Sequence, residues 1–374
     1  MNKIPILKPS VLKEGPIIGL GYRSPWVLGN IVQAKITKKY SLNVMLAQQS
    51  ARELERTKRT FSDVIESAII SAYEANLTLP WGADGDHLRK DTEVQNAAES
   101  GCAHFTYDLT DELKNNQKNV INKICRMYNL TREIRNNDFT TEISLDETDN
   151  VTKLSFIEEI FKELKKIKVK INEVAPRFPG YFEKAIDYYW KKINGKKINN
   201  TKEFSEYLVE LVKLSRKYGF RISIHSGSDK FSIYHLLPKI AGRNFHLKTA
   251  GTYYLEELRV VAKNEPDFFR DIYRFSLKQF EKDRATYELS ADPNKIPDLS
   301  KLNGVQLFNL LESGTGNDDL RQVLHVTYGS ILTSQSSSGD YIFRDKIYSI
   351  LKNNEKEYNK ILSAHIERHI NNLI

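Results

Sequence analysis

Short apolar runs that end in polar or charged residues recur along this chain, with amphipathic segments between several of them. The eight runs cover residues 16–24, 43–50, 77–87, 104–110, 169–176, 221–228, 244–251 and 322–330. Segments 50–76 and 201–219 carry apolar residues at helical spacing, and each begins at or near a serine or threonine that can cap a helix. The pattern predicts buried parallel strands that alternate with helices.

Eight alternations of this kind predict an α/β fold, a (β/α)8 TIM-like barrel. A doubly wound sheet is less favoured, because the first run reads Gly-Leu-Gly-Tyr-Arg-Ser and lacks the third glycine of a dinucleotide-binding turn. Residues 111–168 are too long for one connection, so we expect an inserted excursion after the fourth strand. Residues 341–374 predict extra C-terminal helices, and we assign residues 1–374 to a single domain.

Composition favours a globular protein in a reducing compartment. Hydrophobic residues make up 40% of the chain, which is enough for a sizeable core. The two cysteines, Cys102 and Cys125, fit neither a disulfide framework nor a paired metal-binding spacing. The N-terminal residues lack the apolar run of a signal peptide, and no segment approaches the roughly 18 apolar residues that span a bilayer. We therefore expect a cytoplasmic protein with no membrane partner.

The positive charge is diffuse. A formal charge of +8 arises from 56 basic and 48 acidic residues. Lysines cluster in segments 162–170 and 190–197, which fit solvated helix faces and a turn better than a nucleic-acid groove. We expect a small-molecule substrate and no nucleic-acid partner, since the excess can also attract an anionic ligand. A homo-oligomer is compatible with the sequence.

The runs that contain His225 and His246 hold the most candidate catalytic and metal-binding side chains. In the second run, His246 and Lys248 are two residues apart and share one face of a strand, while Phe245 and Leu247 share the other. In a barrel, the carboxyl ends of the strands converge on one site. The polar residues placed there include Arg23, Gln48, Gln49, Asp84, Asp86, His87, Asp108, Glu173, His225, Asp229, Lys230, His246, Lys248, Arg321 and His325.

Imidazole and carboxylate groups together form the ligand set that borderline divalent metals accept. The ligands would come from separate strands, so no diagnostic spacing identifies the metal. Each residue also has a structural interpretation: a lone histidine at a sheet edge is commonly hydrogen-bonded, and the Trp81–Leu88 stretch reads as a turn with Asp caps and a glycine hinge. The number of these groups at one end of the barrel favours a site.

Five blocks of the sequence together resemble the tagaturonate epimerase family. They cover residues 47–53, 81–88, 223–232, 245–252 and 321–332, in that order along the chain. The resemblance implies a metal-dependent sugar-acid epimerase on a TIM-like barrel that interconverts tagaturonate and fructuronate. The chain is shorter than is typical of the family, mainly before residue 43 and after Thr110.

Given this resemblance, we expect a divalent metal ion, with zinc as the first choice and Mn, Ni or Co as alternatives. The expected metal ligands are Glu173, His225 and His246. The expected catalytic residues are Asp86, Glu53 and Lys248. Asp86 is favoured as the acid or base because a nearby Asp84 would raise its pKa. Glu53 would serve the opposite face of the substrate, although a glutamate in the first turn of a helix is as often a capping residue.

The remaining candidates bind substrate or orient other groups. They are Gln48, Gln49, Asp84, His87, Arg23, Asp229, Lys230 and His325. Arg23, Lys230 and Lys248 are candidates for binding the substrate carboxylate. The two glutamines are candidates for donating hydrogen bonds to sugar hydroxyls. His325 and Asp108 can act as orienting partners of the metal ligands.

Other functions stay open on the sequence alone. The reaction can be a C4 epimerisation by retro-aldol and aldol steps, which can extend to neutral ketohexoses such as tagatose and fructose. A metal-dependent TIM-barrel sugar isomerase or aldolase is the first alternative. A non-catalytic carbohydrate-binding protein is an alternative of another class, and it predicts neither turnover nor metal.

Overall fold

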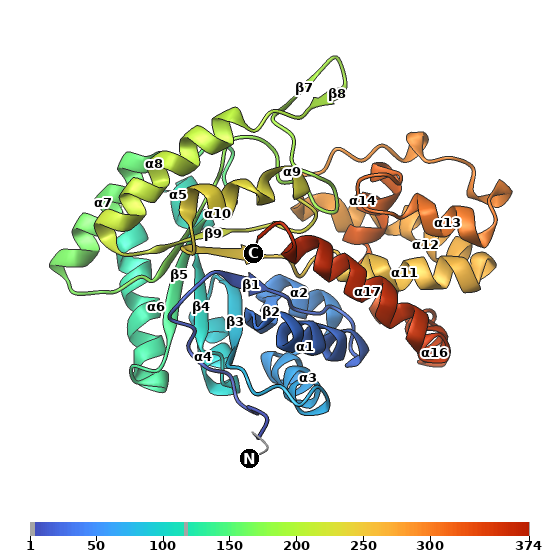
Figure 1. Ribbon diagram of the computed structural model, residues 1–374, viewed down its shortest axis with the longest axis horizontal. Helices are drawn as coiled ribbons and strands as arrows, with labels where there is room; N and C mark the ends of the chain where they lie inside the picture. The colour runs from blue at the N-terminus through green and yellow to red at the C-terminus, as the bar shows by residue number, and fades with distance from the viewer. Residues whose placement is uncertain (1–3, 116–118, 374) are drawn as a thin grey trace.

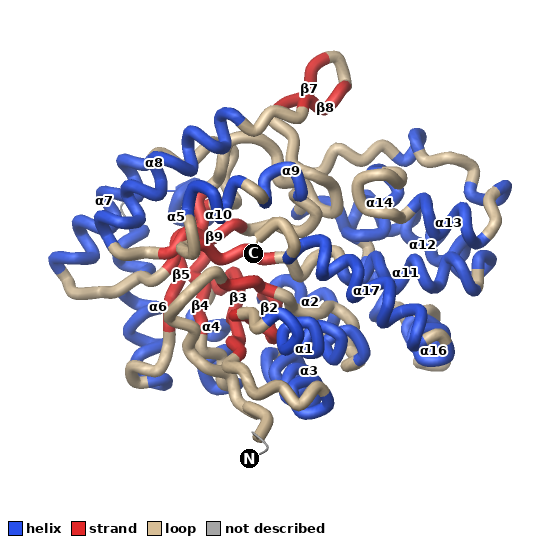
Figure 2. The backbone as a smooth tube through the Cα atoms, viewed as in Figure 1, coloured by secondary structure: helices blue, strands red, loops and turns tan. Residues whose placement is uncertain are grey.

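The structure is a computed structural model that describes residues 4–115 and 119–373. Eight parallel strands close a barrel in the order β1-β10-β9-β6-β5-β4-β3-β2. The strands are β1 Ile17–Gly19, β2 Asn43–Ser50, β3 Trp81–Leu88, β4 His104–Asp108, β5 Thr140–Leu145, β6 Glu173–Pro176, β9 Arg221–Ile224 and β10 Phe245–Lys248. The predicted α/β barrel is confirmed, and Figure 2 shows its strands gathered inside a layer of helices.

The helices around the barrel follow from amphipathic segments between the strands. They are α1 Leu28–Tyr40, α2 Ala51–Thr57, α3 Phe61–Glu74, α4 Asp91–Ser100, α5 Thr110–Asn115, α6 Val120–Arg135, α7 Leu154–Lys166, α8 Lys202–Tyr218, α9 Phe231–Tyr234 and α10 Leu236–Ala241. The predicted segment 50–76 divides into α2 and α3. Lys58 ends the first helix in a left-handed conformation, and the Thr60 side chain caps the second.

Two features of the predicted barrel are wrong. Residues 111–168 are not an inserted excursion, because they contain β5, which pairs with β4 and β6 in the barrel wall. Residues 322–330 are not a strand, because they fall in α14 Asp318–Val326 and α15 Tyr328–Thr333. The Asn317 side chain accepts a hydrogen bond from the Leu320 backbone and caps α14, so the helix begins before the apolar run.

The chain after β10 is helical. It forms α11 Tyr253–Asn264, α12 Pro266–Asp283, α13 Gly304–Leu310, α14, α15, α16 Arg344–Asn353 and α17 Glu355–Ile370, with short 3-10 turns at Arg284–Thr286, Pro293–Lys295 and Leu299–Lys301. These helices gather on one side of the barrel (Figure 1), and α17 packs against both α1 and α11. The predicted C-terminal helices are therefore confirmed as α16 and α17.

A two-stranded hairpin projects from the segment between β6 and α8. Its strands are β7 Lys191–Ile193 and β8 Lys196–Ile198, and the lysine-rich turn is exposed (Figure 1). Among the described residues, none of the helices combines the length and the apolarity needed to cross a bilayer. Cys102 and Cys125 are both free thiols.

The register of the strands brings charged groups together inside the barrel. Glu142 on β5 lies beside Thr106 on β4 and Glu173 on β6, and Glu173 lies beside Arg221 on β9. Successive residues of a strand face opposite sides, so Phe245 and Leu247 enter the apolar layer under the helices while His246 and Lys248 point inward. Around His246 and Lys248, ionisable side chains take the place of the usual apolar filling of a TIM barrel, while Leu12, Ile17 and Met45 form a small apolar cluster.

Candidate active site

A pocket opens at the carboxyl ends of the barrel strands. Its lining comes from β2, β3, α2 and the segments that follow β1, β5, β6, β9 and β10, and includes part of α14. The polar and charged side chains among its lining residues are Arg23, Gln48, Ser50, Arg52, Glu53, Asp86, His87, Asp146, Glu147, Lys184, His225, Ser226, Ser228, Lys248, Tyr287 and His325. Eight of the residues selected from the sequence therefore converge in one place: Arg23, Gln48, Glu53, Asp86, His87, His225, Lys248 and His325.

Lys248 stands at the centre of the pocket floor. Its ammonium nitrogen lies 2.7 Å from Asp86 Oδ1, 2.9 Å from Asp84 Oδ2 and 3.2 Å from Glu142 Oε1. It also donates a hydrogen bond of 2.9 Å to the Thr106 hydroxyl. Burial opposes the charge of Lys248, but the three carboxylates outweigh it and hold the pKa of the amine well above its usual value. Lys248 therefore stays protonated at neutral pH and pairs with three carboxylates.

The sequence predicts a raised pKa for Asp86, and this prediction is wrong. Burial raises the pKa of Asp86, but the nearby Lys248, His87 and His225 outweigh burial and lower it to about 2. Lys248 lies between Asp84 and Asp86, so the two carboxylates share one cation instead of sharing one proton. Asp86 is ionised at neutral pH, as a proton acceptor must be, and its low pKa makes it a weak base and a strong proton donor once it is protonated.

His225 directly follows β9 and points between two carboxylates. Its Nε2 contacts Glu142 Oε1, and its Nδ1 lies 3.3 Å from Asp146 Oδ1. Burial lowers the pKa of His225, but Asp146 and Glu142 outweigh burial and raise it to about 10. At neutral pH both ring nitrogens therefore carry protons that face carboxylates, and Nδ1 can bind a metal ion only when it gives up its proton.

His87 reaches the pocket from an irregular part of β3. The register between β3 and β4 shifts between Gly85 and Leu88, and His87 has a φ of 52°, which is rare outside glycine. Its Nδ1 lies 3.1 Å from Asp108 Oδ2, and Asp108 is also held by Arg89. Asp108 therefore orients the imidazole and leaves Nε2 toward the pocket, as a carboxylate commonly does for a metal-bound histidine.

Glu173 and His246 lie one layer below the pocket. His246 Nδ1 is 2.8 Å from Glu173 Oε2, and the other oxygen of Glu173 pairs with Arg221. His104 and Glu142 complete a fully buried group of two imidazoles and two carboxylates. The three ligands expected from the sequence are thus divided: Glu173 and His246 belong to this deeper group, and His225 lies with Asp86 and His87.

Glu53 combines capping with a place in the pocket. Its backbone N–H donates to the Ser50 hydroxyl, and its Oε2 accepts from the Ser50 N–H, so the two residues form a capping box at the start of α2. Its Oε1 pairs with Arg23, which also lies 3.2 Å from His325 Nε2. Burial raises the pKa of Glu53, but Arg23 outweighs it and the net shift is downward.

Four of the expected substrate contacts lie outside the pocket lining. Gln49 points away from the barrel interior, and Asp84 lies beneath Lys248. Asp229 is fully buried against Arg321. Lys230 donates to the backbone oxygens of Glu183, Ile186 and Ser228, so it organises the surrounding loops.

Sequence reasoning missed several residues of the site. Glu142 was not selected, because segment 140–145 was assigned to an excursion, although its alternation of polar and apolar residues is a strand signal. Asp146, which directly follows β5, was lost with it. Lys184 and Arg52 lie on a loop and on α2, and no strand end points to either of them.

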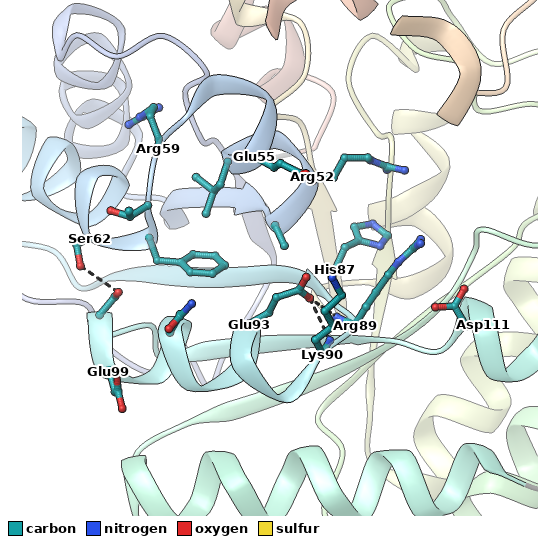
Figure 3. A pocket seen from close by; sticks show the side chains of 16 residues that line it. Arg52, Glu55, Arg59, Ser62, His87, Arg89, Lys90, Glu93, Glu99 and Asp111 are labelled. Atoms are coloured by element: carbon teal, nitrogen blue, oxygen red, sulfur yellow. Dashed lines mark hydrogen bonds between the residues drawn. The ribbon is translucent and has the colours of Figure 1, made fainter. Parts of the chain in front are cut away.

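A wider hollow lies outside the pocket, beside α2, α3 and α4 (Figure 3). Its lining includes Arg59, Glu93 and Asp111, which are typical of a polar surface. Arg52 and His87 line both hollows, so the wider one adjoins the pocket through these two side chains.

The pocket has donors that fit a divalent cation. Asp86, His87 and His225 offer one ligand atom each, and these atoms lie within 4.8 Å of one another. His225 Nδ1 is an unpartnered buried nitrogen of the described region. Carboxylates outnumber permanent cations around Lys248, so a bound cation would also improve the charge balance of a buried site. Mixed imidazole and carboxylate donors suit zinc, manganese, nickel or cobalt.

Comparisons with known proteins agree on one family. The sequence model of the tagaturonate epimerase family matches residues 1–124 and 116–373. The tagaturonate/fructuronate epimerase of Thermotoga maritima is 31% identical over 384 aligned positions, which cover 89% of this chain and 76% of that protein. The native crystal structure of the fructuronate-tagaturonate epimerase from Cohnella laeviribosi has a TM-score of 0.85 and 28% identity, with 99% of this chain and 84% of that one covered. Its complex with one glycerol gives the same TM-score at 29% identity, covering 98% of this chain and 83% of that one.

Proposed function

The chain belongs to the tagaturonate epimerase family, an isomerase family, and from this premise we propose that it interconverts D-tagaturonate and D-fructuronate by inverting C4. The observation that carries the proposal is the convergence of two ionised carboxylates, Asp86 and Glu53, with several basic side chains in one pocket. The carboxylates can move protons, and the basic groups can bind a sugar acid.

The chemistry of C4 favours cleavage of a carbon–carbon bond. C4 is β to the ketone, so its hydrogen is not acidified by the carbonyl group and simple enolisation does not reach it. In the retro-aldol step, a base takes the proton of the C4 hydroxyl and C4 becomes an aldehyde. The C3–C4 bond breaks, and its electron pair moves to C3 and is delocalised onto the C2 carbonyl oxygen. After the aldehyde rotates, the reverse step closes the bond on its other face.

We assign the proton transfer at the C4 oxygen to Asp86. Lys248 keeps the Asp86 carboxylate ionised, which prepares it to accept the hydroxyl proton and to return it when the bond closes. Glu53, on α2, serves the other stereoisomer in the same way, since an epimerase must handle the C4 hydroxyl in two orientations. Arg23 holds Glu53 ionised and in place.

His87 and His225 are the residues that would hold a divalent metal ion. Asp146, 3.3 Å from His225 Nδ1, would be its carboxylate ligand in place of Asp86, which we assign to proton transfer. When bound, such an ion supplies Lewis-acid polarisation to the oxygens on C2 and C3. Asp108 and Glu142 orient the two imidazoles through their other ring nitrogens. Below the site, Glu173 and His246 pair with each other, and His104, 3.4 Å from Glu142 Oε2, helps to fix the position of Glu142.

Lys184 is our candidate for the substrate carboxylate. It is partly exposed in the pocket, and its ammonium donates a hydrogen bond of 2.7 Å to the Ser226 hydroxyl. Among the described residues it pairs with no carboxylate, whereas Arg23 is paired with Glu53 and Arg52 with Glu147. A free cation at the wall of the pocket supports a preference for a sugar acid, so we expect tagatose and fructose to react more slowly.

Incubation of the purified, metal-loaded protein with D-tagaturonate tests the proposal. Formation of D-fructuronate is expected. Release of three-carbon products would indicate a net aldolase, and formation of an aldose acid would indicate an isomerase. Absence of any conversion, with binding retained, would favour a carbohydrate-binding protein.

A further inference from the structure

A second group of possible metal ligands lies away from the pocket, where α17 meets the barrel. It consists of Asp229, in the loop after β9, and of His365 and His369, one turn apart on α17. All three are buried, with exposed fractions of 0%, 5% and 0%. None of them lines the pocket at the barrel mouth. Figure 1 shows α17 running from α16 toward the barrel, alongside α11.

Both imidazoles are turned so that Nε2 faces Asp229. The Nδ1 atom of His369 donates to the backbone oxygen of His365 at 2.8 Å. The Nδ1 atom of His365 lies 3.4 Å from Glu256 Oε1. A backbone carbonyl and a carboxylate behind Nδ1 are the partners that orient metal-bound histidines, and a cation bound to both Nε2 atoms would replace their present contacts with the Asp229 N–H and the Thr252 hydroxyl.

The distances between the inner atoms match those around a small tetrahedral cation. Asp229 Oδ1 lies 3.4 Å from His365 Nε2 and 3.2 Å from His369 Nε2. The Thr252 hydroxyl lies 3.1 Å from His365 Nε2 and 3.3 Å from Asp229 Oδ1. Zinc bonds of about 2.0–2.1 Å in a tetrahedron place neighbouring ligand atoms about 3.3 Å apart.

The carboxylates around this cluster are matched by guanidinium groups. Arg321 pairs with Oδ2 of Asp229, Arg259 pairs with Glu256 and Glu312, and Arg368 lies 3.8 Å from Glu312 Oε1. Oδ1 of Asp229, which faces the two imidazoles, is the oxygen that Arg321 does not hold. The Asp229 backbone N–H also donates to His369 Nε2 at 3.1 Å, and this is the hydrogen bond that an ion would replace.

We propose that Asp229, His365 and His369 bind a structural zinc ion that fastens the C-terminal helix to the barrel. Two imidazoles and one carboxylate are a ligand set that zinc accepts, and the Thr252 hydroxyl occupies the fourth corner. Because the site is closed to the pocket, the ion stabilises the fold and takes no part in the reaction. The site is distinct from the metal site at His87 and His225, and it stands whether or not that site binds metal.

Zinc content and melting temperature, measured on zinc-loaded and dialysed full-length protein, test the proposal. His369→Gln and Asp229→Asn are expected to lose one zinc per chain relative to the wild type, whereas His225→Gln keeps that zinc. EDTA is expected to lower the melting temperature of His225→Gln and to leave that of the double variant His225→Gln/His369→Gln unchanged, because the double variant has neither metal site. The exposed His235 provides the matched control, because His235→Gln removes an imidazole without affecting either site.

Zinc-edge anomalous scattering from wild-type crystals tests the proposal without any substitution, so the result does not depend on whether a variant folds. A peak between Asp229, His365 and His369 is expected. Absence of a peak there after zinc soaking, or zinc content and EDTA response in His369→Gln equal to those of the wild type, would overturn the proposal. A peak there with none at His225 would support this site and contradict the metal site of the proposed function.

Discussion

The ammonium of Lys248 lies 2.7 Å from Oδ1 of Asp86, and both side chains are buried. The same ammonium pairs with Asp84 and Glu142, so one lysine neutralises part of the charge of three carboxylates on the pocket floor. It keeps Asp86 ionised, which a group that accepts a hydroxyl proton requires.

Lys248→Met is expected to destabilise the protein by about 3–5 kcal/mol, because it leaves three buried carboxylates without their cation. Urea unfolding followed by circular dichroism measures the change. Lys39→Met is the matched control, since Lys39 is 60% exposed and solvent screens its pair with Glu367. Equal effects of the two substitutions would contradict a structural role for the Lys248 cluster.

Asp86→Asn is expected to lower turnover by about 10²–10⁴-fold, the usual contribution of a positioned acid or base. The bound metal should be retained, because His87 and His225 keep their donors. His225→Gln should instead lose turnover and the pocket metal together. Turnover with tagaturonate and metal content, measured on the same samples, separate the two roles. Near-normal turnover of Asp86→Asn would remove it from the reaction.

Lys184→Met is expected to raise KM for tagaturonate by about 10- to 100-fold, which corresponds to the loss of one charge-assisted contact. Its effect on tagatose should be small, since tagatose has no carboxylate to lose. Steady-state kinetics with both sugars measure the difference. Lys196→Met is the control, because Lys196 is an exposed lysine of the hairpin that does not line the pocket. Equal losses with both sugars would mean that Lys184 does not bind the carboxylate.

Glu257 predicts a pH dependence of stability that is independent of the pocket. Burial raises the pKa of Glu257 to about 8, and the Ser24 hydroxyl donates to its carboxylate. Between about pH 4.5 and pH 8 the native state keeps this proton while the unfolded chain loses it, so the contribution of Glu257 to stability decreases as the pH rises.

Glu257→Gln removes this titration. The free energy of unfolding of the wild type should fall relative to that of Glu257→Gln between pH 5 and pH 8, by on the order of a few kcal/mol. Urea unfolding at both pH values gives the comparison, and the difference cancels groups common to both proteins. A wild type that gains stability relative to the variant over this range would show that Glu257 is ionised in the native state.

The barrel was predictable because parallel strands buried on both faces leave short apolar runs with abrupt polar ends. Seven of the eight runs contain barrel strands. Run 322–330 was misassigned because its valines and threonine favour a strand locally, whereas the Asn317 cap and the acidic residues Asp318 and Asp319 start a helix just before it. Segment 140–145 was overlooked because Glu142 makes a buried strand look polar.

The residues of the site were easier to predict than the ion pairs they form with one another. Polar strand ends converge in any barrel of this type, which is why Asp86, His225 and Lys248 were selected together. The sequence does not reveal that Lys248 lies between Asp84 and Asp86, because the reach of a lysine across the barrel depends on strand register and tilt. For this reason the sequence predicts a rise in the pKa of Asp86, whereas the structure lowers that pKa.

Conversion of D-tagaturonate in D2O, followed by NMR, tests most directly the claim that C4 is inverted by opening the C3–C4 bond. The retro-aldol route breaks no C4–H bond, so D-fructuronate should form with its original hydrogen at C4. Deuterium at C4 of the product would contradict this account and would indicate direct proton exchange at that carbon.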